Sequence, residues 1–304
     1  MQLTRWLDNV NRNLDEVIEK FISFQTEYNS SSDGVSLANF NFNKVFAENQ
    51  IIELNDRRII FNKINFSYDT ISSGYGPLED RTRRTQCFVI IYSNGVNINY
   101  IINRNSDAQR VLREINKCEG RGEIVENNLD ISSDFFIWLI YKVFKNENIF
   151  EINDTSTITL KSINGFKGDT DDTLTKVSAD GDTVMNLIST LSFMLESSKL
   201  TLIKLITEYG IHEKIELTLS KKSIIGFEYR KYIGDFREEG EEKAISKLLL
   251  LIYLELLPLI IQTYKQEKND DNWNREIYIT FLKEIGQNLS RRVEGKIADI
   301  EENQ

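Results

Sequence analysis

Carboxylates are the only reactive side chains that this sequence gathers in number. The densest group lies in GDTDDTLTKVSADGD at 168 to 182. Its first three members are Asp169, Asp171 and Asp172. Carboxylate oxygens are the ligands that Mg²⁺ and Ca²⁺ prefer, so these aspartates are the candidate metal ligands. The spacing is not that of an EF-hand, because Leu174 stands where that loop needs glycine. A polar turn followed by Asp182 as a helix N-cap accounts for the same residues without an ion.

A second chemical candidate is a lone carboxylate inside the most apolar stretch of the chain. Residues 248 to 261 read LLLLIYLELLPLII, and Glu255 is the only charged residue among them. No cation lies three or four positions away on the same helix. A buried Glu255 would be a desolvated carboxyl that can act as an acid or bind a cation. The alternative places it on a solvent-facing stripe or beside an Arg or Lys of another element.

Basic side chains gather in one short stretch of the first half. The sequence EDRTRRTQ at 79 to 86 carries Arg81, Arg83 and Arg84 directly behind the turn-forming segment GYGP. Three arginines in one loop can hold phosphate groups, so they are the candidate residues for binding nucleic acid or phosphate. Two acidic residues adjoin them and weaken the positive field. Ordinary ion pairs on a solvated loop are therefore the alternative.

Several catalytic mechanisms lack the residues that they need. The single histidine, His212, excludes HExxH and every multi-histidine metal centre, and YGIHEK places it in a turn that we expect to be exposed. Neither a GxSxG nor a GxxxxGK[ST] motif occurs, and GYGPLE at 74 to 79 lacks the third glycine of a dinucleotide loop. Enzymatic activity stays undecided and the sequence leans against it. We expect no cofactor, apart from Mg²⁺ if the aspartates are ligands.

Composition is typical of a water-soluble protein. The 304 residues are 40% hydrophobic and 28% charged, with a net charge of -10, which argues against a general nucleic-acid coat or a binder of anionic membranes. Cys87 and Cys118 show no metal-ligand spacing and suit a reducing compartment. The first twenty residues carry acids throughout and no unbroken apolar region, so we expect no secretory signal. These features predict a cytoplasmic location.

The first half of the chain reads as an α+β domain. Apolar residues recur in steps of four and three through residues 1 to 24, which predicts an amphipathic helix. Two β-hairpins follow at 51 to 61 and 87 to 102, and the second turns at Asn94-Gly95. Two further helices with serine-containing N-caps complete this domain. We expect it to span residues 1 to 148.

The second half, from 149 to 304, predicts the order ββαβββ followed by two long helices. The helix within this sheet runs from Asp182 to Ser197. The last helix, from about 272 to 300, aligns its apolar residues at uniform steps of four, and they are Ile277, Phe281, Ile285, Leu289, Val293 and Ile297. We predict that it packs on another helix. The fold class is therefore α+β, with two antiparallel-sheet modules, packing helices and a helical hairpin at the C-terminal end.

The run at 248 to 261 is too short to cross a bilayer, because a membrane span needs about 20 apolar residues. It has fourteen, with charged residues close to each end and a carboxylate and a proline inside. We predict a core helix and no membrane insertion. Pro258 has no amide hydrogen for the carbonyl of Leu254, so the helix should deviate near 254 to 257.

These observations predict the architecture in more detail than the function. The expected role is a non-enzymatic interaction or accessory protein of a bacterial cytoplasmic assembly, which binds a protein partner or a second copy of itself through its terminal helices. Heavy use of Asn, Ile and Lys is the association that suggests a bacterium or its phage. Nucleic acid remains a further partner to consider, in a setting such as antiviral defence. The alternative is a Mg²⁺-dependent hydrolase or nuclease that uses carboxylates.

Overall fold

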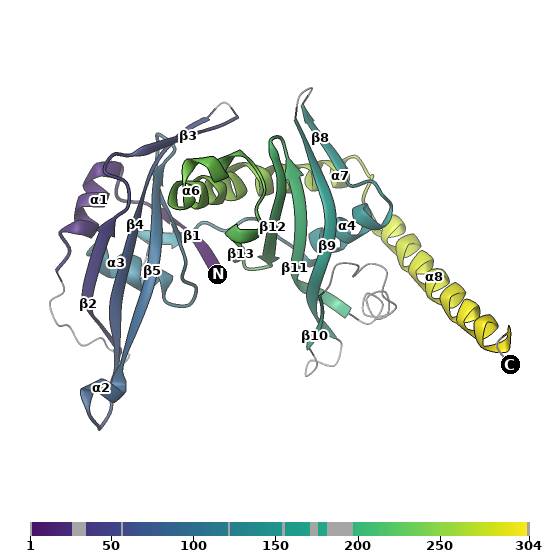
Figure 1. Ribbon diagram of the computed structural model, residues 1–304, viewed down its shortest axis with the longest axis horizontal. Coiled ribbons are helices and arrows are strands. Elements are labelled where there is room, and N and C mark those ends of the chain that lie inside the picture. The colour runs from purple at the N-terminus through teal and green to yellow at the C-terminus, as the bar shows by residue number, and fades with distance from the viewer. Residues whose placement is uncertain are drawn as a thin grey trace. The chain divides into compact units, whose positions relative to one another are not determined.

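The structure is a computed structural model. It describes residues 2–25, 35–55, 57–120, 122–153, 156–170, 176–180 and 197–302, without the side chains of 169, 170, 176–180, 197 and 198. Antiparallel sheets carry packed helices, so the predicted α+β class is confirmed (Figure 1). The chain forms two compact units, each made of two stretches. Unit 1 is Met1–Asn128 with Glu238–Glu255, and unit 2 is Leu129–Arg237 with Leu256–Gln304. The expected domain boundary at 148/149 stays a prediction.

Unit 1 is built on one antiparallel sheet. Its strands are β1 (Gln2–Asp8), β2 (Val35–Lys44), β3 (Gln50–Leu54), β4 (Arg57–Ser72), β5 (Thr82–Ser93), β6 (Ile98–Ile102) and β7 (Ile124–Glu126). Its helices are α1 (Leu14–Ile22), α2 (Leu78–Arg81), α3 (Ala108–Ile115) and α6 (Glu241–Leu251). The strand order is β7-β1-β6-β5-β4, and the far edge of β4 pairs with β3 at its start and with β2 along the rest.

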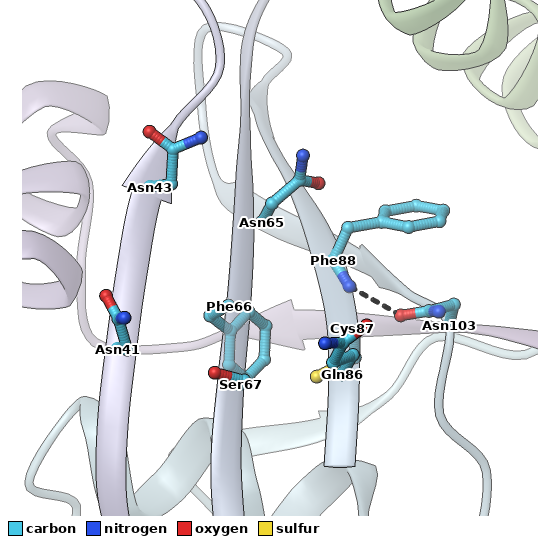
Figure 2. A pocket seen from close by; sticks show the side chains of 9 residues that line it. All are labelled: Asn41, Asn43, Asn65, Phe66, Ser67, Gln86, Cys87, Phe88 and Asn103. Carbon is cyan, nitrogen blue, oxygen red and sulfur yellow. Dashed lines mark hydrogen bonds between the residues drawn. The ribbon is translucent and has the colours of Figure 1, made fainter.

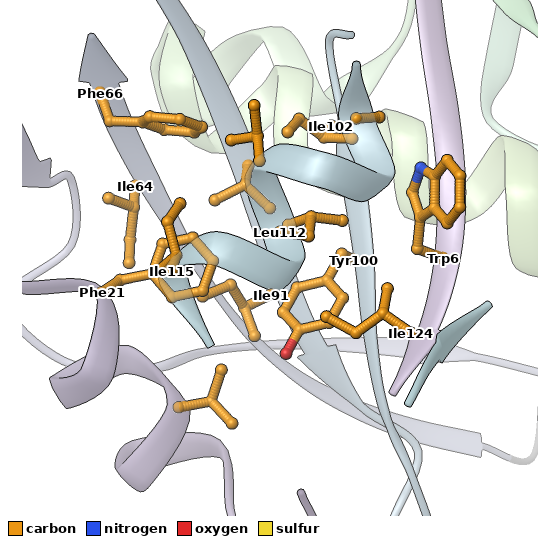
Figure 3. Packing of buried hydrophobic residues seen from close by; sticks show 14 of the residues in the cluster. Trp6, Phe21, Ile64, Phe66, Ile91, Tyr100, Ile102, Leu112, Ile115 and Ile124 are labelled. Atoms are coloured by element: carbon orange, nitrogen blue, oxygen red, sulfur yellow. The ribbon is translucent and has the colours of Figure 1, made fainter. Parts of the chain in front are cut away.

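Helices α1 and α3 cover one face of this sheet, and the core of unit 1 lies between the sheet and these two helices (Figure 3). Strand residues alternate between the two faces, so Ile64, Phe66 and Tyr68 of β4 all point into this core. Phe21 of α1 meets them from the helical layer and is fully buried. Burying each such side chain contributes about 1.5–3 kcal/mol of hydrophobic free energy.

The prediction of a helix over residues 1 to 24 is wrong for the first third of that range. Residues 2 to 8 form β1, which lies between β6 and β7 and buries side chains on both of its faces, with Leu3 on one and Trp6 on the other. A short apolar run fits a buried strand as well as a helix, and the strand prevails here because neighbours pair with both of its edges. The helix begins only at Leu14, where the side chain of Asn13 accepts hydrogen bonds from two amides of the first turn.

Both predicted hairpins of unit 1 are present as β3–β4 and β5–β6. In the second, Gly95 alone adopts positive φ, at +88°, while the side chain of Asn94 accepts from the amides of Val96 and Asn97. The loop therefore has four residues between the paired strands. Sequence patterns missed β2 and the long continuation of β4 to Ser72, because both are rich in asparagine and other polar residues that strands usually lack.

Unit 2 contains a second antiparallel sheet. Its strands are β8 (Ile149–Asn153), β9 (Ser156–Thr170), β10 (Lys176–Asp180), β11 (Ser197–Tyr209), β12 (His212–Ser220) and β13 (Ile225–Phe227), in the order β10-β9-β11-β12-β13 with β8 on β9. Its helices are α4 (Ser133–Phe144), α7 (Leu257–Asn269) and α8 (Arg275–Glu302). Helix α4 packs on β9 and β11. The helix predicted between Asp182 and Ser197 falls almost wholly outside the described residues.

The apolar run belongs to one continuous helix, Glu241–Asn269. Within the part of the chain that the structure describes, it is the one helix long and apolar enough to span a membrane, but 78% of its apolar stretch is buried inside the protein. The predicted core helix is therefore compatible with a soluble protein.

The predicted deviation near Pro258 appears as a turn of π-helix, η4 (Ile252–Leu256), between α6 and α7. Pro258 has no amide hydrogen to offer Leu254. The carbonyl of Leu254 accepts a hydrogen bond from Arg57 Nη2 at 2.7 Å, and that of Tyr253 accepts from Arg5 Nη1 at 3.1 Å. Two arginines of unit 1 thus satisfy carbonyls beside the break in the helical hydrogen bonds.

Candidate interaction surface

The base of α8 is fixed to unit 2 by apolar contacts. Phe281 and Ile285 are 1% and 0% exposed. The ring of Phe281 lies 5.4 Å from the rings of both Tyr141 and Phe144 on α4, measured between centroids. These edge-on contacts bury the side of α8 that carries Phe281.

Polar contacts orient the segment that leads into α8. The carboxylate of Asp134, in the first turn of α4, accepts from Trp273 Nε1 at 3.1 Å and from the hydroxyl of Tyr264 on α7. Asn274 then caps α8, because its side-chain oxygen accepts from the amides of Glu276 and Ile277 at 2.9 and 3.0 Å. The direction in which α8 leaves the unit is therefore set by contacts at both α4 and α7.

The far half of α8 carries apolar side chains into solvent. Val293, Ile297 and Ile300 are 52%, 50% and 52% exposed, whereas a helix of a folded unit usually turns such residues inward. In Figure 1 this half reaches away from α4 and from the strands of its own unit. The exposed face is continuous rather than scattered, which is the pattern that marks an interaction surface.

Spacing along this half follows the heptad rule of paired helices. Positions separated by steps of four and three share one side of the helix, and they are Leu282, Gly286, Leu289, Val293, Lys296 and Ile300. We call these six residues the α8 seam. Among the described residues, no atom outside the adjoining residues and backbone of α8 lies within 4 Å of the place where a side chain at Gly286 would begin, so a second backbone can approach closely there. An apolar seam with one lysine and one glycine suits a helical partner.

Charge is also ordered along the far half of α8. Arg291 and Arg292 come first, Glu294 and Lys296 follow, and Asp299, Glu301 and Glu302 stand at the end. A parallel second copy would set like charges against each other. An antiparallel copy would set the arginines of each helix beside the acids of the other, which is favourable at an exposed helical interface.

The three predicted basic residues lie on two different elements. Arg81 ends α2, whereas Arg83 and Arg84 lie on β5, so the expectation of a single arginine loop is wrong. Arg81 donates to the carbonyls of Ser72 and Gly76 at 2.8 and 3.3 Å.

Arg84 is paired with the carboxylate of Asp69 at 3.0 Å and also donates to Ser67 Oγ at 2.6 Å. Arg83 is exposed. Arg81 and Arg84 thus make local contacts, and the binding of phosphate or nucleic acid by the three arginines stays a prediction.

The predicted carboxylate sites lie partly outside the described residues. Glu255 lies in η4 and is 5% exposed, so it does not lie on a solvent-facing stripe, whereas a desolvated carboxyl and a position beside an Arg or Lys of another element both stay predictions. Asp171 and Asp172 lie outside the described residues, and of Asp169 only the backbone, in β9, is described. Among the described residues no three His, Cys, Asp or Glu side chains come together as metal ligands.

His212 was expected in an exposed turn, and the structure corrects this. It opens β12 and is 5% exposed, with its Nδ1 atom 2.7 Å from the hydroxyl of Tyr232. That hydroxyl also accepts from the amide of Phe236 at 3.3 Å. Burial lowers the pKa of His212 to about 4. A neutral histidine is therefore part of the folded sheet of unit 2.

The sequence matches no protein-family model and no curated protein.

Proposed function

We propose that the protein is a non-enzymatic interaction component that associates with a second copy of itself through the α8 seam. The single observation that carries this proposal is the exposure of Val293 and Ile300 of the seam, with Ile297 exposed beside them, on a helix whose base is firmly packed. Apolar residues on a surface cost solubility unless a partner covers them. The order of charges along α8 favours an antiparallel copy as that partner.

The proposed dimer is isologous, because the same face of each copy meets its equivalent. In an antiparallel arrangement Leu289 and Val293 of one helix lie near the acidic end of the other. The contact is short, so we expect reversible association that depends on protein concentration. Such a contact can join two copies without fixing the rest of either chain.

A bacterial cytoplasmic assembly is the setting that we propose for this component. Both cysteines are free thiols, with Cys87 buried and Cys118 half-buried. Burial raises the pKa of each to about 12, so both stay protonated and unreactive at neutral pH. Free thiols outside any site suit a reducing compartment.

The experiment is sedimentation velocity on the full chain over a concentration series. Val293→Lys places a charge in the seam, and Val96→Lys is the matched control, because Val96 is 67% exposed in a hairpin of unit 1. We expect the wild type and Val96→Lys to have the same dimer dissociation constant. For Val293→Lys we expect a dissociation constant about tenfold or more higher. A wild type that stays monomeric, or a Val293→Lys variant that still dimerises as strongly, would contradict the proposal.

A further inference from the structure

A second surface lies in unit 1, on the face of the sheet opposite to α1 and α3. Cross-strand pairs align polar side chains of β2, β4 and β5 in two rows. The rows are Asn43, Asn65 and Phe88, and Asn41, Ser67 and Gln86. We call these six residues the amide face. Figure 2 shows them around an open depression of about 440 Å³.

Strand alternation explains why these residues face outward. Their neighbours Phe42, Phe66 and Cys87 point to the other side, where they form or adjoin the core of unit 1. Asparagine is disfavoured in strands, yet it occupies both outward positions of β2 in this region and one of β4. An outward strand position that only needed solvation would accept threonine or a charged residue at lower cost. The amides therefore place hydrogen-bonding groups on this face of the sheet.

The amides of this face keep their hydrogen-bonding capacity. Within the described ranges, the side chains of Asn41, Asn43, Asn65 and Gln86 donate to and accept from no protein group. Each offers two donor hydrogens and one acceptor oxygen. Beside them, Asn103 is engaged, because its Oδ1 atom accepts from the amide of Phe88 at 2.6 Å. Phe88 is thereby held at the edge of the rows.

Charge at the rim is balanced. Arg84 is neutralised by Asp69 at 3.0 Å, and Lys63 by Glu242 at 2.5 Å. The ammonium of Lys63 also lies 4.1 Å from the centre of the Phe88 ring. Binding of a polyanion depends on unpaired cations, and the chain as a whole carries a net charge of -10. The surface thus favours an uncharged ligand with many hydroxyl or amide groups.

We infer that the amide face binds a neutral oligosaccharide. Sugar hydroxyls both donate and accept, which matches side-chain amides group for group. Neighbouring strands are about 4.8 Å apart, and same-face residues along one strand about 6.8 Å apart, so the rows repeat on the scale of one pyranose ring. The open shape admits an extended chain, and the Phe88 ring offers an apolar surface for a sugar ring at one edge.

This inference is independent of the α8 seam, since the amide face and α8 belong to different units. The test is isothermal titration calorimetry of the full chain with maltohexaose, cellohexaose and chitohexaose, and with a short single-stranded DNA of mixed sequence. The double variant Asn43→Ala/Asn65→Ala removes one row of amides. Gln287→Ala, which removes an exposed amide from α8, is the matched control.

We expect at least one of the three sugars to bind, the double variant to weaken that binding about tenfold or more, and the control to bind like the wild type. Gln86→Ala, from the second row, should weaken it by a smaller factor, and unchanged thermal unfolding of each variant shows that the fold is intact. Failure of all three sugars to bind, sugar binding that survives the double variant, or binding of the DNA in place of the sugars overturns the inference.

Discussion

The packed part of unit 2 and the far half of α8 use the same residue types in opposite ways. Phe281 and Ile285, near the start of α8, are fully buried against α4, whereas Val293 and Ile297, three and four turns further on, are half exposed. The helix is continuous between them. The difference shows that the first half of α8 belongs to the core of its unit, while the second half presents an apolar surface that its own unit does not cover.

Geometry explains this change along one helix. Each step of four residues advances about 40° beyond a full turn, because the α-helix has 3.6 residues per turn. Four such steps, from Phe281 to Ile297, rotate the side chain by about 160°. A line of apolar residues that faces α4 at the start therefore faces away from it at the end.

The largest expected effect lies at the buried end. Phe281→Ala should lower the free energy of unfolding by about 3–5 kcal/mol, since it removes a buried ring and leaves a cavity against Tyr141 and Phe144. Val293→Ala, at the exposed end, should change it by less than about 0.5 kcal/mol. Urea unfolding, at a protein concentration low enough to keep the chain monomeric, measures both. Equal losses at the two sites would remove the distinction between the halves.

A pH titration tests the packed part of unit 2 by a different route. His212 has a folded pKa of about 4, below the ordinary value of 6.5, so the unfolded chain binds the proton first as the pH falls. The contribution of His212 to the free energy of unfolding is fully present above about pH 6.5. It is lost as the pH falls from about 6.5 to about 4. The loss amounts to about 3 kcal/mol.

Urea unfolding at pH 7 and pH 4.5 measures this loss, and His212→Gln is the reference because carboxylates titrate in both proteins. The wild type should lose more stability than the variant between the two pH values. An identical loss would show that the histidine is not buried in the neutral form.

A smaller effect is expected at the boundary between the two halves. Lys145, which directly follows α4, and Glu284 of α8 form an ion pair with 2.6 Å between Nζ and Oε2, and each side chain is about one-third exposed. The hydrogen bond that Lys145 donates to Glu284 raises the pKa of Lys145, so the pair persists at neutral pH.

Glu284→Gln should lower the free energy of unfolding by no more than about 1 kcal/mol, because solvent screens such pairs. The loss should shrink in high salt. Lys283→Ala, beside it on the exposed side, is the control. A loss as large as that of Phe281→Ala would mean that the charge, and not the ring, fixes the base of α8.

Sequence patterns predicted the class of fold, both hairpins of unit 1 and the long C-terminal helices, since these depend on local periodicity and turn residues. They also located the deviation at Pro258, because a missing amide hydrogen is a local property. Residues 2 to 8 were misassigned because strand pairing with distant β6 and β7 decided their structure.

The candidate surfaces could not be predicted in full, because the exposure of each residue depends on which distant segment packs against it, and a single sequence does not reveal that. Steps of four located the apolar line of α8, but which of its residues are buried depends on tertiary packing against α4. The amide face could have been suspected from NFNFN at 39 to 43, where alternating asparagine and phenylalanine is typical of a strand with one buried face. His212 was misplaced because the aromatic residues that bury it follow about twenty positions later.

The most direct test of the central claim is the sedimentation comparison of the wild type with Val293→Lys, read against Val96→Lys at equal concentrations. Self-association through the α8 seam predicts a concentration-dependent dimer in the wild type and the control, and a monomer in Val293→Lys over the same range. If all three proteins sediment identically, as monomers or as dimers, α8 is not the surface that joins two copies.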